Sequence, residues 1–268
     1  MKVFAICTIV NHAGQYAAMR ESFLAAGFDE ERCVYDHLDN RGGNRHEPYA
    51  AFNRSKSAAR ARYLICCHQD VLLSQGHGYA DLLRALEELS ARDPTWAVAG
   101  NAGVNLRYQL VARITDRVGT PAWTGALPEQ VAGVDENFLV VNLGVEPDTI
   151  YWSENLSGFH FYGSDVCLNA SRHGRRSYVI DFQLEHLGQG ILSPEFWAIK
   201  ARFQCHWEKS FRVAYMISPT MIPIVLTRYA WLRRLADLPA VQKRLLRPRS
   251  LRLAHWCGLS PVPPKPAG

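Results

Sequence analysis

The sequence predicts an α/β fold with a mostly parallel central sheet flanked by helices. Within the first hundred residues, short apolar runs rich in β-branched side chains alternate with segments of helical periodicity. Continuous apolar runs are typical of parallel strands covered on both faces, and their alternation with helices favours a doubly wound sheet. With 268 residues, 48% of them hydrophobic, the chain can hold one such domain and an appendage.

Each expected element has its own signal. Apolar runs mark the expected strands, at residues 3–10, 32–37, 63–67, 96–99, 108–114, 138–143 and 177–182. Helical spacing or helix-forming composition marks the expected helices, at residues 15–26, 49–62, 81–91 and within 156–172. Gly27 and Gly174 close the first and last of these, because glycine accepts the left-handed conformation of a helix C-terminus. Gly, Asn and Pro predict loops at 39–48 and 119–133, the second long enough to be mobile.

The C-terminal part differs in composition. We expect a sheet domain at 1–193 and a mainly helical, basic extension at 194–268, whose Pro-rich residues 261–266 lack fixed structure. The net charge of +5 arises here, from seven basic residues against the single acid Asp237: Arg233, Arg234, Lys243, Arg244, Arg247, Arg249 and Arg252. Such a run is a solvated face or attracts an anionic surface. Because no nucleic-acid recognition element accompanies it, we expect no nucleic-acid partner.

Cysteine usage and hydropathy indicate a compartment. Seven cysteines at irregular spacing, several in apolar runs, favour reduced thiols and a cytoplasmic protein. The adjacent Cys66 and Cys67 point to opposite faces of a strand and so are not expected to share a metal. The most apolar late stretch, residues 213–227, is interrupted by Pro219 and Pro223. It is also shorter than the roughly 18 residues that a membrane span needs. We therefore expect no membrane-spanning segment.

The sequence His68, Gln69, Asp70, Val71 follows directly on the expected strand at 63–67. Open α/β sheets bind ligands at the carboxyl ends of their strands. A carboxylate placed there can hold a divalent cation against a diphosphate. Out of context, Asp70 would be a helix N-cap and His68 a core histidine; the strand-end setting favours a ligand role for Asp70, and less strongly for His68.

Two segments resemble a known family. Residues 49–71 resemble family-2-like glycosyltransferases in which His-Gln-Asp-Val replaces an Asp-x-Asp motif, with Asn53 in the preceding helix and the small residues Ala58 and Ala59 after it. Residues 159–190 are similar to the later block of that family. There Asp165 opens a helix, Gly174 follows nine residues later, and His186 lies just beyond the next strand. The resemblance extends weakly from about residue 3 to residue 190.

The resemblance implies a GT-A fold and a metal-dependent, inverting transfer of sugar from a nucleoside-diphosphate sugar to an acceptor hydroxyl. It implies that Asp165 is the general base, and that Asp70 and His186 bind Mn²⁺ or Mg²⁺. It also implies that Asn53, His68 and Gln69 contact the donor. Many members carry an acid two positions before Asp165, where this chain has Gly163. If the base belongs there, Asp165 is a capping or acceptor-orienting residue and the catalyst is weakened or altered.

Other polar and aromatic residues are expected around the same site. The residues expected at the nucleotide end the first and second strands: Thr8, Val10, Asn11, Asp39 and Asn40. The residues expected at the acceptor combine a carboxylate with aromatic rings, which suit the hydroxyls and apolar faces of sugars: Asp135, Trp123, His160 and Tyr162. The expected acceptor is a glycan or a lipid-linked glycan, in polysaccharide synthesis.

Other functions stay open at the level of sequence. Gly163 leaves room for a non-catalytic sugar- or lipid-glycan-binding protein. A nucleotidyltransferase would use a similar sheet and metal, but no Gly-rich phosphate loop with a following Lys lies near the first strand. Residues 211–252 pass from apolar and aromatic to Arg-rich, which predicts docking on the anionic inner face of a membrane. The alternative is that their apolar residues pack on the sheet domain.

Overall fold

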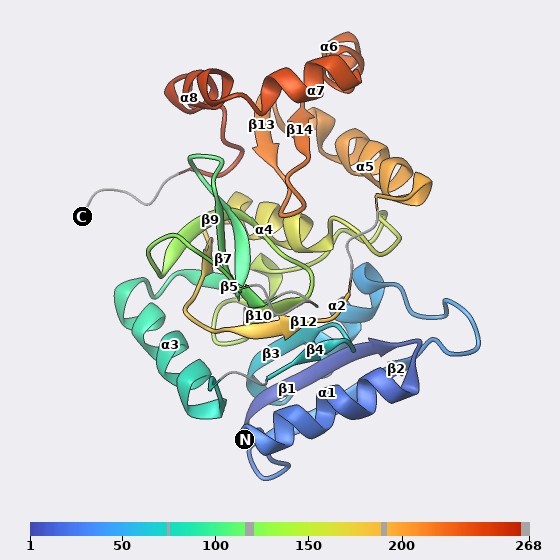
Figure 1. Ribbon diagram of the computed structural model, residues 1–268, viewed down its shortest axis with the longest axis vertical. Coiled ribbons are helices and arrows are strands. Elements are labelled where there is room, and N and C mark those ends of the chain that lie inside the picture. The colour runs from blue at the N-terminus through green and yellow to red at the C-terminus, as the bar shows by residue number, and fades with distance from the viewer. Residues whose placement is uncertain (74–75, 116–120, 189–191, 264–268) are drawn as a thin grey trace.

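The structure is a computed structural model that describes residues 1–73, 76–115, 121–188 and 192–263 (Figure 1). A large curled sheet carries helices on both faces, and a small two-stranded sheet with three short helices stands at the C-terminal end. The described part of the large sheet has the strand order β2-β1-β3-β10-β5-β11-β9-β6-β7-β12-β4, with β8 paired to β7. The α/β class expected from the sequence is confirmed.

The first half of the sheet is parallel apart from one strand. Five strands run in the same direction: β1 (Lys2–Val10), β2 (Cys33–Asp39), β3 (Ala61–Cys67), β5 (Trp96–Gly100) and β11 (Arg176–Val179). The antiparallel β10 (Phe138–Asn142) lies between β3 and β5. Because β1 lies between β2 and β3, the chain leaves β1 toward one side and returns on the other. A crevice between strand ends is expected at such a switch point.

The second half of the sheet is built from short strands that are mainly antiparallel. They are β9 (Glu129–Val134), β6 (Ala102–Asn105), β7 (Leu110–Thr115), β8 (Pro121–Thr124), β12 (Leu184–His186) and β4 (Val71–Leu72). The loop expected at 119–133 therefore contains β8 and β9, while its residues 119–120 lie outside the described residues. The pairing of β4 with β12 places Val71 opposite His186, and this brings two distant segments of the predicted site together.

Helices cover both faces of the parallel half. α1 (Ala13–Ala25) and α3 (Tyr79–Arg92) pack on one face, and α2 (Pro48–Ala58) and α4 (Tyr162–Arg172) on the other. Alternate residues of β1 divide between them, since Phe4 and Ile6 join the first core and Ala5 and Cys7 the second. Cys66 and Cys67 divide in the same way. The doubly wound arrangement predicted from the apolar runs is thus present.

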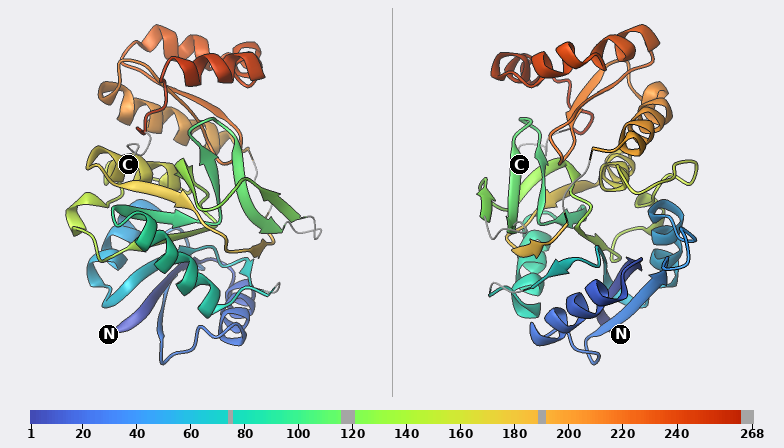
Figure 2. Two further views of the ribbon diagram at one scale, coloured as in Figure 1. Left: turned by 90° about the vertical axis from the view of Figure 1, so that its left-hand side faces the viewer. Right: turned by 45° about the vertical axis from the view of Figure 1, so that its right-hand side comes forward.

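The C-terminal part contains more than helices. α5 (Pro194–Trp207) and the turn η2 (Glu208–Ser210) lead into a hairpin of β13 (Ala214–Ile217) and β14 (Pro223–Leu226). Three short helices follow, α6 (Ala230–Ala236), α7 (Pro239–Leu245) and α8 (Pro248–Trp256), at the end of the molecule opposite the N-terminus (Figure 2). None of the helices in the described ranges combines the length and the hydropathy that a membrane crossing requires.

The hairpin corrects the expectation for residues 211–226. Its apolar side chains are buried, Met216 and Ile224 in the same core as Leu64 and Cys66 of β3. They are therefore not free to meet a lipid surface. The tail differs as well, because Val262 is buried and the carbonyl of Pro263 accepts a hydrogen bond of 2.9 Å from Gln130 Nε2. Residues 264–266 of the expected tail lie outside the described residues.

Candidate metal and nucleotide site

A cavity of about 310 Å³ opens at the carboxyl ends of β1, β2 and β3. Its apolar lining comes from Ile9, Pro48, Phe52, Cys67 and Phe159. Its polar lining comes from Asn11, Asn40, His68, Gln69, Asp70, His160 and Tyr162. The strand order explains this gathering, because parallel strands end at one edge of the sheet and the segment before α4 closes the cavity from the other side.

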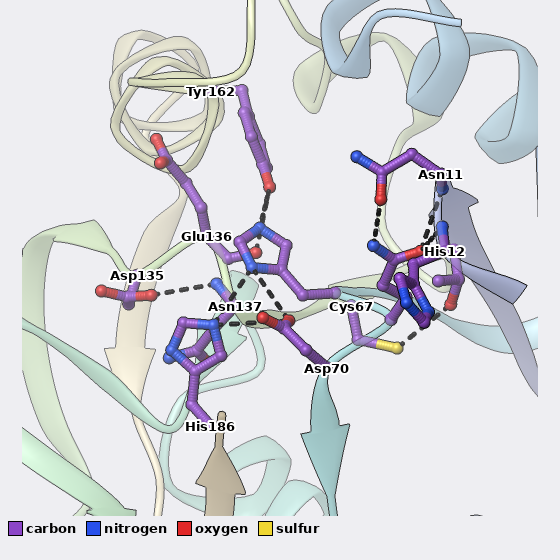
Figure 3. A network of polar contacts seen from close by, with 12 residues as sticks. Asn11, His12, Cys67, Asp70, Asp135, Glu136, Asn137, Tyr162 and His186 are labelled. Carbon is purple, nitrogen blue, oxygen red and sulfur yellow. Dashed lines mark hydrogen bonds and ion pairs between the residues drawn. The ribbon is translucent and has the colours of Figure 1, made fainter. Parts of the chain in front are cut away.

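Gln69 joins the end of β1 to the loop after β3. Its Oε1 accepts hydrogen bonds of 2.9 Å from the backbone N–H groups of Asn11 and His12, and its Nε2 donates to Asn11 Oδ1. Below it, Thr8 is fully buried with Oγ1 3.4 Å from Cys67 Sγ. The polar end of β1 is thereby fixed beside the metal-ligand candidates (Figure 3).

Three potential metal ligands converge next to this clamp. One ligand atom each of His68, Asp70 and His186 lies within 4.8 Å of the others. His186 Nε2 is 3.4 Å from His68 Nδ1 and 3.5 Å from Asp70 Oδ1. Asp70 Oδ1 is 3.8 Å from His68 Nδ1. Figure 3 shows Asp70 and His186 facing each other at the edge where β4 pairs with β12.

Hydrogen bonding fixes the tautomer of His68. The hydroxyl of Tyr162 donates to the carbonyl oxygen of Glu136 at 3.1 Å, and Tyr162 Oη lies 2.8 Å from His68 Nε2. Since the hydroxyl proton is directed to Glu136, His68 Nε2 is assigned as the donor to Tyr162. Nδ1 then carries a free lone pair that faces Asp70 and His186. Such a second hydrogen bond orients histidines that bind metals.

The pKa values of the three side chains in the cluster shift in different directions. Burial and the neighbouring His186 lower the pKa of His68 to about 4, so His68 is neutral. Burial also lowers the pKa of His186, but the hydrogen bond and charge of Asp70 raise it above its usual value on balance. Burial opposes the ionisation of Asp70, and the hydrogen bond from His186 together with both imidazoles lowers its pKa. Asp70 and His186 therefore each favour the charged form of the other.

Two imidazole nitrogens and one carboxylate oxygen form a donor set that fits a divalent cation of the first transition series. Mg²⁺ prefers an oxygen environment, whereas imidazole favours softer ions. A proton on His186 would be displaced by such an ion. Gly188 gives the cluster its space, because a Cβ there would lie 2.5 Å from Asp70 Oδ2 and 2.9 Å from His186 Nε2.

The residues expected at the nucleotide are only partly brought together. Asn11 and Asn40 line the cavity. Asn40 also holds the following loop, with its Oδ1 accepting from the backbone of His46 at 2.9 Å and its backbone N–H donating to Val10 O at 2.7 Å. Asp39 is exposed and paired with Arg41 at 2.9 Å, which lowers the pKa of Asp39. Asp39 does not line the cavity, because it lies beside Asn40 on the other side of the strand end.

Asn53 lies elsewhere than predicted. Its Nδ2 donates to Trp152 O at 2.7 Å, and its Oδ1 accepts from Trp152 N at 3.0 Å. Both ends of the amide are used in holding the strand-like segment before α4, and Asn53 lines a separate open depression rather than the cavity at the strand ends. Asn53 therefore lies outside the cavity in which its contact with the donor was expected.

Asp165 is also placed differently. It is fully buried, and its carboxylate accepts hydrogen bonds from the backbone and hydroxyl of Ser153, from Asn169 and from Trp207. Burial raises the pKa of Asp165 to about 6, against the opposing effect of Ser153 and Trp207. A base must reach the proton it removes, and a carboxylate enclosed by four donors does not. The structure gives Asp165 the role of joining α4, α5 and the segment before α4.

The residues expected at the acceptor fall into two groups. His160 and Tyr162 line the cavity. Asp135 does not line it, and its Oδ1 accepts a 2.9 Å hydrogen bond from the backbone of Asn137 within the turn before β10. Trp123 is 61% exposed on β8, outside the cavity lining. The wide separation follows from the antiparallel half of the sheet, which carries β8 away from the strand ends.

Glu136, which no sequence pattern singled out, lies beside the cluster. Burial, and then the charge of Asp135, raise the pKa of Glu136 to about 8, against the effect of backbone N–H groups of Gly163, Phe161 and Tyr162. In Figure 3, Glu136 and Tyr162 lie together above the pair of Asp70 and His186. Nothing in the local pattern distinguishes Glu136 from Asp135. Only its contact with the distant start of α4 does so.

One comparison shows relatedness over most of the chain. The chain is 34% identical over 215 residues to a protein of Fuscovulum blasticum named ATP synthase subunits region ORF 6, across 78% of this chain and 85% of that protein. The chain belongs to the family of that protein. The name gives a position in a genome region and no activity. No family model matches the sequence.

Solved structures are similar at low identity. Mannosyltransferase PcManGT from Pyrobaculum calidifontis, in complex with GDP-Man and Mn²⁺, is 14% identical with a TM-score of 0.49, over 96% of this chain and 72% of that one. TarS 1–349 of S. aureus with UDP-GlcNAc is 13% identical with a TM-score of 0.48, over 76% and 66%. GalNAc-T7 with UDP, GalNAc and Mn²⁺ is 10% identical with a TM-score of 0.44, over 70% and 44%. At these TM-scores the likeness carries no argument about the reaction of this chain.

Proposed function

We propose that the chain is a GT-A-type glycosyltransferase that moves a sugar from a nucleoside-diphosphate sugar to an acceptor hydroxyl. One observation carries the proposal: the ligand atoms of His68, Asp70 and His186 converge beside a cavity at the carboxyl ends of β1, β2 and β3. A diphosphate leaving group needs positive charge where the sugar departs, and a strand-end metal site beside a cavity is suited to supply it.

The three ligands would hold Mn²⁺ in preference to Mg²⁺, because two of the three donor atoms are imidazole nitrogens. Bound there, a divalent cation supplies charge neutralisation for the departing diphosphate. The residues of the chain position the donor and the acceptor. Gln69 and Asn11 fix the end of β1 at the rim, while Asn40 orders the loop that borders the nucleotide side. His160 and Tyr162 form the opposite wall, on which we place the sugar or acceptor.

Asp70→Asn tests the metal-dependent step. We expect calorimetry to show Mn²⁺-dependent binding of UDP or GDP by the wild type and at least a tenfold loss in Asp70→Asn, because the variant removes the only carboxylate of the cluster. Asp148→Asn, the same change at an exposed position of the turn η1 (Pro147–Thr149), is the matched control and should bind normally. Unchanged binding in a folded Asp70→Asn protein would remove Asp70 from the site.

The alternative functions give different results in the same assay. A sugar-binding protein that has lost catalysis would bind a sugar nucleotide and release no nucleoside diphosphate from a panel of UDP-, GDP- and dTDP-sugars. A nucleotidyltransferase would release pyrophosphate or a nucleoside monophosphate, because it attacks phosphorus. A glycosyltransferase releases nucleoside diphosphate, by slow hydrolysis when no acceptor is present.

We further propose that residues 1–193 carry the chemistry and that helices α6 to α8 attach the protein to an anionic membrane. The hairpin is excluded from this contact by its burial, but five large apolar side chains on or beside the helices are at least 46% exposed: Trp231, Leu235, Leu238, Leu253 and Trp256. Leu235 and Leu238 lie within the basic run 233–252, and the other three flank it. The single acid of that run, Asp237, is bound to the buried Lys200 and so does not offset this charge. Cations near anionic lipid contribute roughly 1 kcal/mol each.

Vesicle co-sedimentation tests the attachment. We expect the protein to pellet with phosphatidylserine-containing vesicles at low salt, and less at high salt. Trp231→Ala combined with Trp256→Ala should weaken pelleting. Trp197→Ala, which changes an exposed tryptophan of α5, is the control and should not. Absence of the wild type from the pellet at low salt would refute the attachment.

A further inference from the structure

The start of α4 approaches the turn before β10 unusually closely at Gly163. A Cβ at this position would lie 2.4 Å from the carbonyl oxygen of Val134 and 3.2 Å from Cγ of Glu136. Both distances are shorter than ordinary contacts of a side chain. The missing side chain of Gly163 therefore makes room for the carbonyl group of Val134 and, next to it, for the stem of Glu136.

The backbone before Gly163 is shaped around that acid. Phe161, the residue that precedes α4, has φ +66 and ψ 4, a left-handed conformation that is costly for a bulky side chain. From there the backbone N–H groups of Phe161, Tyr162 and Gly163 act on the Glu136 carboxyl group. These amides favour the ionised form of the Glu136 carboxyl group and partly oppose the effect of burial on its pKa. A locally strained turn that positions one acid is typical of functional sites.

Glu136 is also coupled to the metal-ligand cluster. Its carbonyl oxygen accepts the hydroxyl proton of Tyr162, whose oxygen accepts from His68 Nε2. The next residue, Asn137, accepts a 2.8 Å hydrogen bond from the backbone N–H of His68. The position of Glu136 relative to the cluster is therefore fixed by two separate connections. Glu136 does not itself line the cavity at the strand ends, but it is partly exposed and lies beside Tyr162, which does line that cavity (Figure 3).

Asp165 and Asp135 differ from Glu136 in their surroundings. Asp165 is fully buried and engaged by four donors. Asp135 uses one carboxylate oxygen on the backbone of its own turn. Because a neighbouring charge and limited hydration both make the carboxylate of Glu136 more basic than usual, Glu136 accepts a proton more readily than an exposed acid does.

We propose that Glu136 is the general base of this site, in place of an acid at position 163. The inference rests on the proposed glycosyl transfer. The acceptor oxygen forms a bond to the anomeric carbon while the bond from that carbon to the diphosphate oxygen breaks. The bonding electrons leave with the diphosphate, and the acceptor proton passes to a carboxylate oxygen of Glu136. When water is the acceptor, the same bonds form and break, and the product is the free sugar.

The test uses water as the acceptor, so that no acceptor needs to be identified. Release of nucleoside diphosphate from UDP-, GDP- and dTDP-sugars with Mn²⁺ is followed from about pH 5.5 to 9, beside calorimetric binding of the nucleoside diphosphate. Glu136→Gln should cut hydrolysis by about 10²-fold or more and lose the rise of rate with pH, while nucleotide affinity and melting temperature stay near the wild type. Glu136→Asp keeps a carboxylate and should retain the pH dependence at a lower rate. Glu146→Gln, at an exposed position, should match the wild type.

The outcomes separate this inference from the proposed function. Glu136→Gln with unchanged rate and pH profile would overturn the role of Glu136 and leave the glycosyltransferase intact. Loss of the pH dependence in Asp135→Asn but not in Glu136→Gln would assign the base to Asp135 instead. A wild type that binds no nucleoside diphosphate with Mn²⁺ would refute the proposed function itself. Loss of hydrolysis in Glu136→Gln with nucleotide binding retained would support both.

Discussion

Tyr162→Phe removes a single hydroxyl from the centre of the site and leaves the ring in place. Tyr162 is 2% exposed, and its ring packs on Tyr49 and Phe52. The hydroxyl donates a hydrogen bond to Glu136 O at 3.1 Å and accepts one from His68 Nε2 at 2.8 Å. In the variant, His68 Nε2 loses its acceptor, and nothing then distinguishes the tautomer with a free Nδ1 from the one with a free Nε2.

The expected effect on metal binding follows from this contact. Removing the hydrogen-bond partner of a metal-binding histidine costs about 10- to 100-fold in metal affinity, which corresponds to about 1.4–2.7 kcal/mol. The loss of two hydrogen bonds of the hydroxyl costs about 1–3 kcal/mol of folding stability. The variant should therefore remain folded and bind Mn²⁺ more weakly.

The matched control for Tyr162→Phe is Tyr49→Phe. The hydroxyl of Tyr49 donates to His160 O at 2.8 Å, the ring is equally buried, and no hydrogen bond joins Tyr49 to His68. Both variants lose one buried tyrosine hydroxyl, so their stabilities should fall by similar amounts. Mn²⁺ titration in the absence of nucleotide should separate them, with weaker binding only in Tyr162→Phe. Equal Mn²⁺ affinity in Tyr162→Phe and wild type would refute the reasoning on the tautomer.

Three further substitutions test the packing around the site. Gly188→Ala should weaken Mn²⁺ binding roughly tenfold with little change in melting temperature, because the new Cβ would lie 2.5 Å from Asp70 Oδ2 and must displace that side chain. Gly163→Ala should destabilise the protein by about 1–3 kcal/mol, because its Cβ would lie 2.4 Å from the carbonyl of Val134, and overpacking outweighs the gain of up to about 1 kcal/mol in helix propensity. Asp165→Ala should cost about 3 kcal/mol or more, because it leaves buried donors without an acceptor.

Gly42→Ala serves as the control for both glycine variants, since its Cβ would meet only the end of the Arg45 side chain at 3.5 Å. The stability of all four proteins is measured by thermal unfolding, and their Mn²⁺ affinity by titration. A Gly188→Ala protein with normal Mn²⁺ affinity would show that the cluster tolerates a side chain there. A Gly163→Ala protein at least as stable as the wild type would contradict the close approach of α4 and β9. A stable Asp165→Ala protein would contradict the structural role of that carboxylate.

The parallel half of the sheet was predictable because burial on both faces leaves a clear mark in the sequence. β1, β3 and β5 are continuous apolar runs, and the strands lie where those runs are. The antiparallel half was not predictable in the same way. β4 has two residues and β12 has three, too few for any period to appear. Their pairing depends on long-range geometry, and it is this pairing that brings His186 to Asp70.

The C-terminal hairpin shows a different limit. Residues 213–227 are apolar without a clean alternation, so composition alone fits a helix as well as a buried strand pair. Pro223 excludes a helix interior, yet it is compatible with the first residue of β14 in a two-stranded sheet. The burial of Met216 and Ile224 is decided by the core that β13 and β14 share with the large sheet. That core is a property of the folded chain as a whole.

The site residues divide by the same logic. Asp70, His68 and Gln69 line the cavity, as expected of residues that directly follow a strand end. Asp165 lies away from the cavity, because the first turn of α4 has one side toward the cavity and one toward the core, and the sequence does not say which side Asp165 occupies. The structure turns Tyr162 to the cavity and Asp165 to Ser153 and Trp207.

The same geometry explains why a glycine stands at 163 and an acid at 136. The carbonyl of Val134 lies so close to the start of α4 that any side chain at 163 must push β9 and α4 apart. An acid at position 163 and the observed packing of β9 against α4 therefore exclude each other, whereas an acid supplied from the turn after β9 is compatible with that packing. Gly163→Asp in a Glu136→Gln background should then fail to restore hydrolysis, because the new carboxylate would enter only by separating the two elements that position the site. Restored hydrolysis in that double variant would show that α4 can move away from β9, and that the glycine is not what directs the base to Glu136.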